Sequence, residues 1–152
     1  MKPLMLALAL AAVFSPGAAL AAGEVNHKPF DPVLEQAQDA SNREDWKGAQ
    51  AILKEALVRD PKNAEYHNEY AYNLRKGPNP DMSLVFEHYN EALRIDPKHR
   101  GANEYLGEAY LMVGNLPKAK EQLAALDKIC FLPCKEFSDL KKHIAEYEAK
   151  GK

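Results

Sequence analysis

The feature that most constrains this chain is a helical unit that recurs about every 35 residues. Each copy opens with a residue that caps helices and continues with an apolar pair spaced four positions apart. The opening residues are Asp45, Asp81 and Asn115, and the pairs are Ala49 with Leu53, Val85 with Tyr89, and Ala119 with Leu123. A unit of this length cannot bury its apolar face alone, so neighbouring copies have to stack. The pattern predicts an all-α solenoid, whose concave surface suits the binding of other proteins.

The third copy is the best defined. Apolar residues over 102–113 follow a helical stripe, and they are Tyr105, Leu106, Ala109, Tyr110 and Val113. Gly114 then ends this helix and Asn115 caps the next, which tolerates Pro117 in its first turn.

This segment resembles the tetratricopeptide repeat (TPR), whose pattern is W-x2-L-G-x2-Y, followed by A-x3-F and a later A and P. Leu106-Gly107-x2-Tyr110 matches this pattern, whereas Asn103 stands where the family prefers Trp. Residues 64–97 form a looser copy, and residues 32–61 form a third, with Gln36 where the family prefers Leu. The resemblance implies a right-handed α-solenoid of three TPR-like helix pairs, at about residues 31–63, 64–99 and 100–133.

A final amphipathic helix is expected over residues 135–149. Its apolar positions lie at helical spacing, and they are Phe137, Leu140, Ile144 and Tyr147. A solenoid needs a terminal element with a polar outer side, so we interpret this segment as a C-terminal capping helix. Residues 31–152 then form one helical domain, preceded by a flexible leader at 22–30.

The first 21 residues have the features of a secretory signal peptide. A basic start at Lys2 precedes an apolar run from Leu4 to Phe14, and Ala19-Leu20-Ala21 supplies a small-x-small cleavage site. This run is too short to span a bilayer core of about 30 Å. We therefore expect export to the periplasm or the medium, with cleavage after Ala21.

Charge and hydropathy make two further classes of partner unfavourable for the mature chain. Removal of Lys2 lowers the count of basic residues from 20 to 19, against 22 acidic residues. This balance provides no basic stripe for nucleic acid. No apolar run after the signal segment is long enough for a membrane span.

The two cysteines, Cys130 and Cys134, bracket Phe131-Leu132-Pro133 before the final helix. In an exported chain, an even number of cysteines indicates a disulfide, and Pro133 can turn the chain to close it. The alternative is a periplasmic copper or redox protein, because thiolates favour Cu(I) and His143 lies on the adjoining helix. Copper-delivery proteins with C-x3-C use a fold that contains strands, and none is predicted here.

No enzyme is expected from the remaining motifs. The sequence contains no G-x-S-x-G, no G-x-G-x-x-G and no H-E-x-x-H, and the five histidines are scattered. We interpret His67 as a packing residue and the other histidines as solvated. No cofactor and no metal site is predicted.

The resemblance also places particular residues on the inner face of the solenoid. In TPR proteins the first helix of each pair lines the groove, and the corresponding positions here are Asn68, Tyr72, Arg75, Glu104, Glu108 and Met112. Family members that bind chaperone tails grip a carboxylate with Lys, Arg and Asn, whereas this chain carries Glu104 and Glu108 there. We therefore predict an adaptor for a protein or peptide partner that carries Lys or Arg near an apolar anchor, which packs on Tyr72 and Met112. Self-association through an open end of the stack is a further expectation.

Overall fold

The computed structural model describes residues 30–151, which form seven α-helices and no strand. The expected signal peptide and nearly all of the expected leader lie outside this range. In chain order, the helices are α1 (Pro32–Asn42), α2 (Trp46–Arg59), α3 (Ala64–Lys76), α4 (Met82–Ile95), α5 (Arg100–Met112), α6 (Leu116–Ile129) and α7 (Lys135–Ala149). The prediction of an all-α chain is confirmed.

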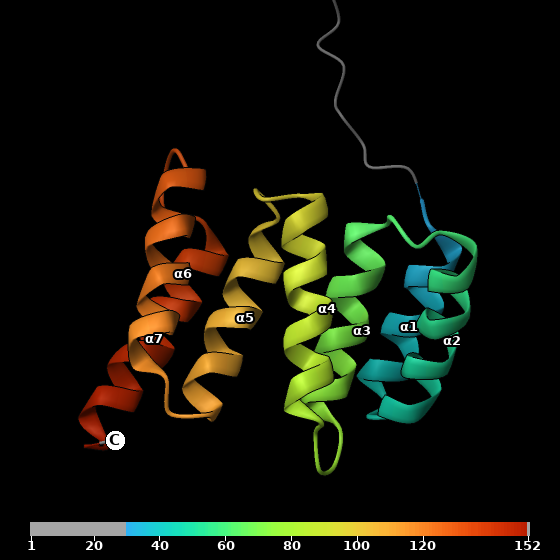
Figure 1. The fold of residues 1–152 in the computed structure, drawn as a ribbon, viewed down its shortest axis with the longest axis horizontal. Helices are drawn as coiled ribbons and strands as arrows, with labels where there is room; N and C mark the ends of the chain where they lie inside the picture. Colours follow the sequence, from blue (N-terminus) through green and yellow to red (C-terminus); the bar gives the residue numbers. More distant parts are fainter. Residues whose placement is uncertain (1–29, 152) are drawn as a thin grey trace, which may run out of the picture.

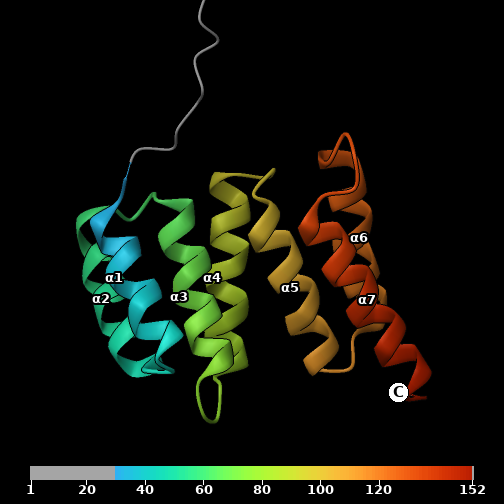
Figure 2. The same ribbon diagram turned by 180° about the vertical axis from the view of Figure 1, so that it is seen from behind.

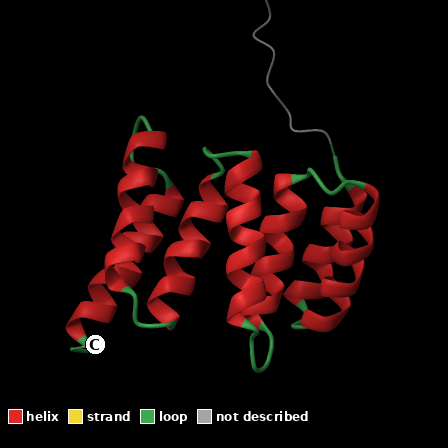
Figure 3. Cartoon of the chain, in the orientation of Figure 1, coloured by secondary structure: helices red, strands yellow, loops and turns green. Residues whose placement is uncertain are grey.

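The helices stack side by side in two layers (Figures 1 and 3). The odd-numbered helices form one layer, which faces the viewer in Figure 2, and α2, α4 and α6 form the other. Within the described residues, α1 contacts α3, α3 contacts α5 and α5 contacts α7, whereas α2, α4 and α6 do not contact one another. The odd layer is therefore the tighter, inner side of the stack.

Side-chain caps set the start of six of these helices. The oxygen atoms of Asp31, Asp45, Asn63, Asp81 and Asn115 accept hydrogen bonds from the first-turn amides, and His99 accepts one from Ala102 through Nδ1. Such bonds satisfy amides that have no partner inside the helix. Only α7 lacks a side-chain cap, because Cys134 occupies that position.

The core consists of three apolar clusters along the stack. The first joins α1, α2 and α3 through Leu34, Ala37, Leu53 and Tyr70. The second joins α3, α4 and α5 through Ala71, Val85, Tyr89, Leu106 and Ala109. The third joins α6 and α7 through Ala119, Leu126, Leu140 and Ile144. Each pair thus buries its apolar face against the next, as a repeat unit must.

In α1 the buried face runs through Leu34, Ala37 and Ala40, while Val33 is only half-buried. One sequence assignment of a packing residue was wrong. Val113 lies beyond the last residue of α5, where the chain turns, and it is exposed.

Helix α7 packs against both α5 and α6, on the end of the stack. Leu140 and Ile144 are buried there, and Gly107 of α5 allows the close approach. A Cβ atom on Gly107 would lie 2.6 Å from Leu140 Cδ2, well inside van der Waals contact. None of the helices in residues 30–151 is both long enough and apolar enough to span a bilayer.

Candidate binding face

The six residues predicted to line the groove lie on two neighbouring helices of the inner layer, α3 and α5. They differ widely in exposure. Asn68, Arg75 and Glu104 are buried, with exposed fractions of 2%, 8% and 5%, while Met112 is 53% exposed. Tyr72 and Glu108 are half-buried. Of the six side chains, Met112 therefore offers the largest surface to a partner.

Glu108 lies against Arg75 of α3 and His143 of α7. Arg75 Nη1 of α3 lies 2.7 Å from Glu108 Oε2, and both side chains are largely buried. The Arg75 Nε–H also donates to the hydroxyl of Tyr89, at 3.3 Å. On the other side, His143 Nδ1 of α7 lies 2.9 Å from Glu108 Oε1, without the angles of a hydrogen bond. The charge of Glu108 is therefore largely compensated within the protein.

Glu104 lies one turn earlier on α5 and is not compensated in this way. Burial raises its pKa to about 7, and the negative charge of Glu108 adds to this rise. Lys135 at the start of α7 opposes the rise but does not cancel it. Near neutral pH, Glu104 therefore carries a charge only part of the time.

Aromatic rings fill the space between α3 and α5. The ring centroid of Tyr72 lies 5.1 Å from that of Tyr105 and 6.5 Å from that of Trp46. The guanidinium of Arg75 lies 5.7 Å from the Tyr72 ring and 5.6 Å from the Tyr105 ring. These distances fit aromatic and cation–π packing. Tyr72 therefore packs against the buried arginine.

A groove of about 620 Å³ opens at the C-terminal end of α5, and we call it the C-terminal groove. Its walls come from α3, α5, the α5–α6 turn and α7, with lining residues Arg75, Glu108, Leu111, Met112, Val113, Gly114, His143, Glu146, Tyr147 and Lys150. Exposed Met112 and Val113 give it an apolar floor beside charged walls. Its size and mixed lining suit a short peptide segment.

A second groove of about 450 Å³ opens at the N-terminal end of α5, and we call it the polar groove. It lies between α3, the α4–α5 turn and the start of α7, with lining residues Glu65, Asn68, Glu69, Asp96, Lys98, His99, Arg100, Gly101, Tyr105 and Glu136. Among the predicted residues, only Asn68 lines it, and Tyr72 and Glu104 line neither groove.

The contribution of α7 to both grooves was missed in the sequence. His143 and Tyr147 wall the C-terminal groove, and Glu136 walls the polar groove. The signal was present: positions 136, 140, 143 and 147 form one stripe at helical spacing. Two of these four side chains are polar, so a search for apolar positions alone did not identify this face of α7.

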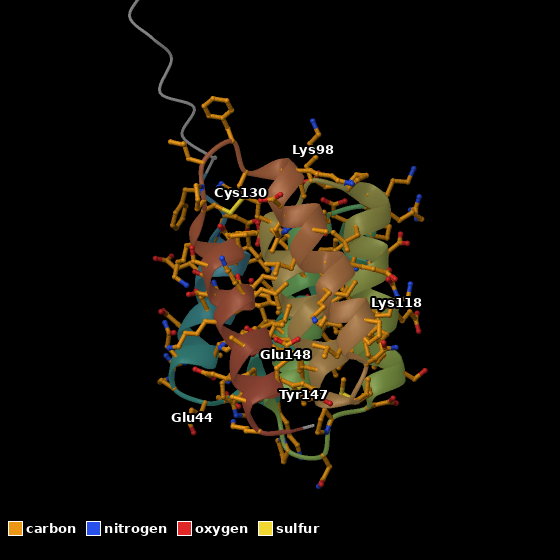
Figure 4. The ribbon with its side chains drawn as sticks, turned by 90° about the vertical axis from the view of Figure 1, so that its left-hand side faces the viewer. Glu44, Lys98, Lys118, Cys130, Tyr147 and Glu148 are labelled. Atoms are coloured by element: carbon orange, nitrogen blue, oxygen red, sulfur yellow. A yellow bond between two sulfur atoms is a disulfide. The ribbon has the colours of Figure 1, made fainter. Side chains whose placement is uncertain are left out.

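Cys130 and Cys134 form a disulfide, with 5.8 Å between their Cα atoms, as predicted. The bond lies at one end of the molecule, beside the labelled Cys130 in Figure 4, with Tyr147 toward the other end of α7. In this oxidised state neither sulfur is a thiolate, which is the form that binds metals. No group of three candidate metal ligands lies together in residues 30–151.

The histidines are less solvated than expected. His67 is buried, as predicted, but its Nδ1 lies 2.8 Å from Nδ1 of His88, and its Nε2 lies 3.1 Å from the carbonyl oxygen of Pro61. His99 caps α5. The expectation that His88 and His99 are solvated was wrong, because both pack within the helix stack.

Comparisons with solved structures find close similarity in fold at low sequence identity. The Yersinia enterocolitica type III secretion translocator chaperone SycD is 14% identical, with a TM-score of 0.67 over 78% of this chain and 83% of that chain. PcrH in complex with the chaperone-binding region of PopD is 13% identical, with a TM-score of 0.67 over 79% of this chain and 91% of that chain.

The first TPR of Spaghetti (RPAP3), bound to the HSP90 peptide SRMEEVD, is 17% identical, with a TM-score of 0.63 over 77% of this chain and 90% of that chain. No protein-family model matches the sequence, and no curated protein is similar to it in sequence. The fold of this chain is TPR-like: a right-handed α-solenoid of three helix pairs with a C-terminal capping helix.

Proposed function

We propose that this protein is an exported adaptor that holds a segment of a partner protein against its inner face. The observation that carries the proposal is the C-terminal groove, where Met112 is 53% exposed on an apolar floor. An exposed methionine beside other apolar side chains is an adaptable contact for a partner's apolar anchor. The similar structures of PcrH and RPAP3 are complexes with a protein region and with a peptide, which supports a similar use here.

Export is part of this proposal and rests on the sequence of residues 1–21, together with the disulfide, a bond typical of oxidising compartments. Mass spectrometry of the protein from its native host should find an N-terminus at Ala22 or a near neighbour. An intact Met1 in the extracytoplasmic fraction would contradict this part.

The binding test is selection of random ten-residue peptides on the mature protein, followed by affinity measurement. Met112→Ala should weaken the selected peptides by about 1–3 kcal/mol if Met112 is a hot spot. Val58→Ala is the matched control, because Val58 is an equally apolar residue, 80% exposed, on α2 of the other layer. Equal loss in both variants, or no loss in either, would place the binding surface elsewhere.

Self-association and the copper or redox alternative are tested by separate measurements. Self-association would appear as a concentration-dependent mass in sedimentation, and Met112→Ala would reduce it if the groove is the contact. The copper or redox alternative requires reduced Cys130 and Cys134, so thiol titration and metal analysis of freshly isolated protein test it directly. Free thiols with bound copper would overturn the adaptor proposal.

A further inference from the structure

We propose that the polar groove receives a lysine side chain of the same partner segment, so that the site reads a primary ammonium group. This inference rests on the proposed function and deepens it. The partner's cation is therefore expected in the polar groove and not at Glu108, because Arg75 and His143 already contact the Glu108 carboxylate.

The first observation is an unsatisfied acceptor at Asn68. Its side chain lines the polar groove and is 2% exposed. The Nδ2–H group donates to Glu69 Oε1 at 3.1 Å, but the buried Oδ1 accepts no hydrogen bond. A buried acceptor without a donor costs free energy until a donor reaches it. An ammonium group brings three donors and no acceptor.

The second observation is the charge around Asn68. Four carboxylates line the groove, against two fixed cations, Lys98 and Arg100. The four are Glu65, Glu69, Asp96 and Glu136. Within the groove, His99 Nε2 lies 3.7 Å from Glu65, and Arg100 Nε lies 3.9 Å from Glu136. The lining carboxylates outnumber Lys98 and Arg100, and this balance of charge favours a cation.

Of these carboxylates, Glu69 also acts on the phenol of Tyr105. Burial raises the pKa of Tyr105, and the negative charges of Glu104 and Glu69 raise it further. Tyr105 lines the polar groove, so its ring offers an aromatic face next to the carboxylates. Such a face attracts an ammonium group as well.

The two grooves lie at opposite ends of α5, which sets the spacing that the partner must have. A helix rise of about 1.5 Å per residue puts roughly 16 Å between Gly101 and Met112. An extended peptide covers this distance in about five residues, at about 3.3 Å each. The lysine should therefore lie about five positions from the apolar anchor in the C-terminal groove.

The probe is a capped peptide with two adjacent leucines and one lysine five positions away, the rest glycine and serine. NMR titration of the mature protein reads the two grooves separately, through the Met112 methyl signal and the Asn68 side-chain amide signal. The lysine peptide should shift both signals. Its twin with norleucine for lysine should shift only Met112 and bind at least about tenfold weaker.

Asn68→Leu removes the acceptor, and with it the donor to Glu69, while it keeps the branched shape of the side chain. It should weaken the lysine peptide about tenfold and leave the norleucine twin unchanged. Asn90→Leu, the same substitution on the exposed side of α4, is the matched control and should change neither. Should Asn68→Leu fail to fold, Glu136→Gln tests the same groove, and it should also weaken only the lysine peptide.

The outcomes separate the two proposals. If both peptides bind equally and shift only Met112, the lysine inference is wrong and the proposed function stands. If neither peptide shifts Met112, the proposed function is wrong and this inference falls with it. Spermidine is the third probe. If it binds more tightly than the lysine peptide, the ligand of the polar groove is a free polyamine and the lysine inference is wrong.

Discussion

Arg75 connects charged and aromatic side chains of the inner face. Its guanidinium is buried between Tyr72 and Tyr105 and paired with Glu108. Removing one member of a buried ion pair leaves the other charged and without compensation. Arg75→Met should therefore lower the free energy of unfolding by about 3–5 kcal/mol, measured by urea denaturation.

The double variant Arg75→Met with Glu108→Gln should recover part of this loss, because the orphaned carboxylate is removed as well. Glu55→Gln on α2, an exposed carboxylate, is the control and should change stability little. A loss below about 1 kcal/mol for Arg75→Met would show that the pair is not structural.

Glu104 gives a prediction that depends on pH. Its pKa is about 7 in the folded protein and is expected near its ordinary value in the unfolded chain. The folded state therefore binds more protons than the unfolded state between these values, so stability falls as pH rises from about 4.5 to about 7. Glu104→Gln should be more stable than wild type at pH 8, by at most about 3 kcal/mol, and equal to it near pH 4.5. The same difference in unfolding free energy between Glu104→Gln and wild type at both pH values would contradict this prediction.

At the scale of elements, the start of α7 is held by a covalent bond instead of a cap. Cys134 occupies the capping position without a side-chain hydrogen bond, and its disulfide to Cys130 ties α7 to the end of α6. Closing so short a loop contributes about 2 kcal/mol in the chain-entropy picture. The double variant Cys130→Ala with Cys134→Ala should lose about this amount, a few degrees in Tm.

Serine at position 134 provides a sharper comparison. Serine caps helices well, so Cys130→Ala with Cys134→Ser should lose less, by about 0.5–2 kcal/mol, than the double alanine variant. Equal melting temperatures for the two variants would show that α7 does not need its N-terminus fixed.

The contact between Gly107 and Leu140 tests how α7 docks. Leu140 is fully buried, so Leu140→Ala should lower the free energy of unfolding by about 2–5 kcal/mol. Gly107→Ala should destabilise the wild type, because its Cβ would lie 2.6 Å from Leu140 Cδ2. In the Leu140→Ala background the same change should be neutral or stabilising, since alanine favours helix. Additive losses would argue against a direct contact.

At the scale of the whole molecule, the fold was predictable because each signal is local. The caps Asp45, Asp81 and Asn115 and the apolar spacing after them define helices within a few residues of sequence. The pairing of charged side chains on the inner face could not be predicted from such local signals. Glu108 reads as a free anion until Arg75, 33 positions away, is placed beside it. The match to TPR positions identified which helices face inward, but not which of their side chains are already paired.

The final prediction concerns the end of the stack. The helices in residues 30–151 contact only their nearest and next-nearest neighbours, so each end of the solenoid has to be covered by its own terminal helix. Truncation after Phe131 removes α7 and exposes the faces that pack on Leu140 and Ile144. The truncated chain should aggregate or lose its cooperative melt, measured by light scattering and calorimetry. Removal of Gly151 and Lys152 alone is the control, because this leaves α7 (Lys135–Ala149) intact. If the truncated chain stays monomeric and melts as the full chain does, α7 does not cover the stack, and its apolar face becomes a second candidate for partner binding.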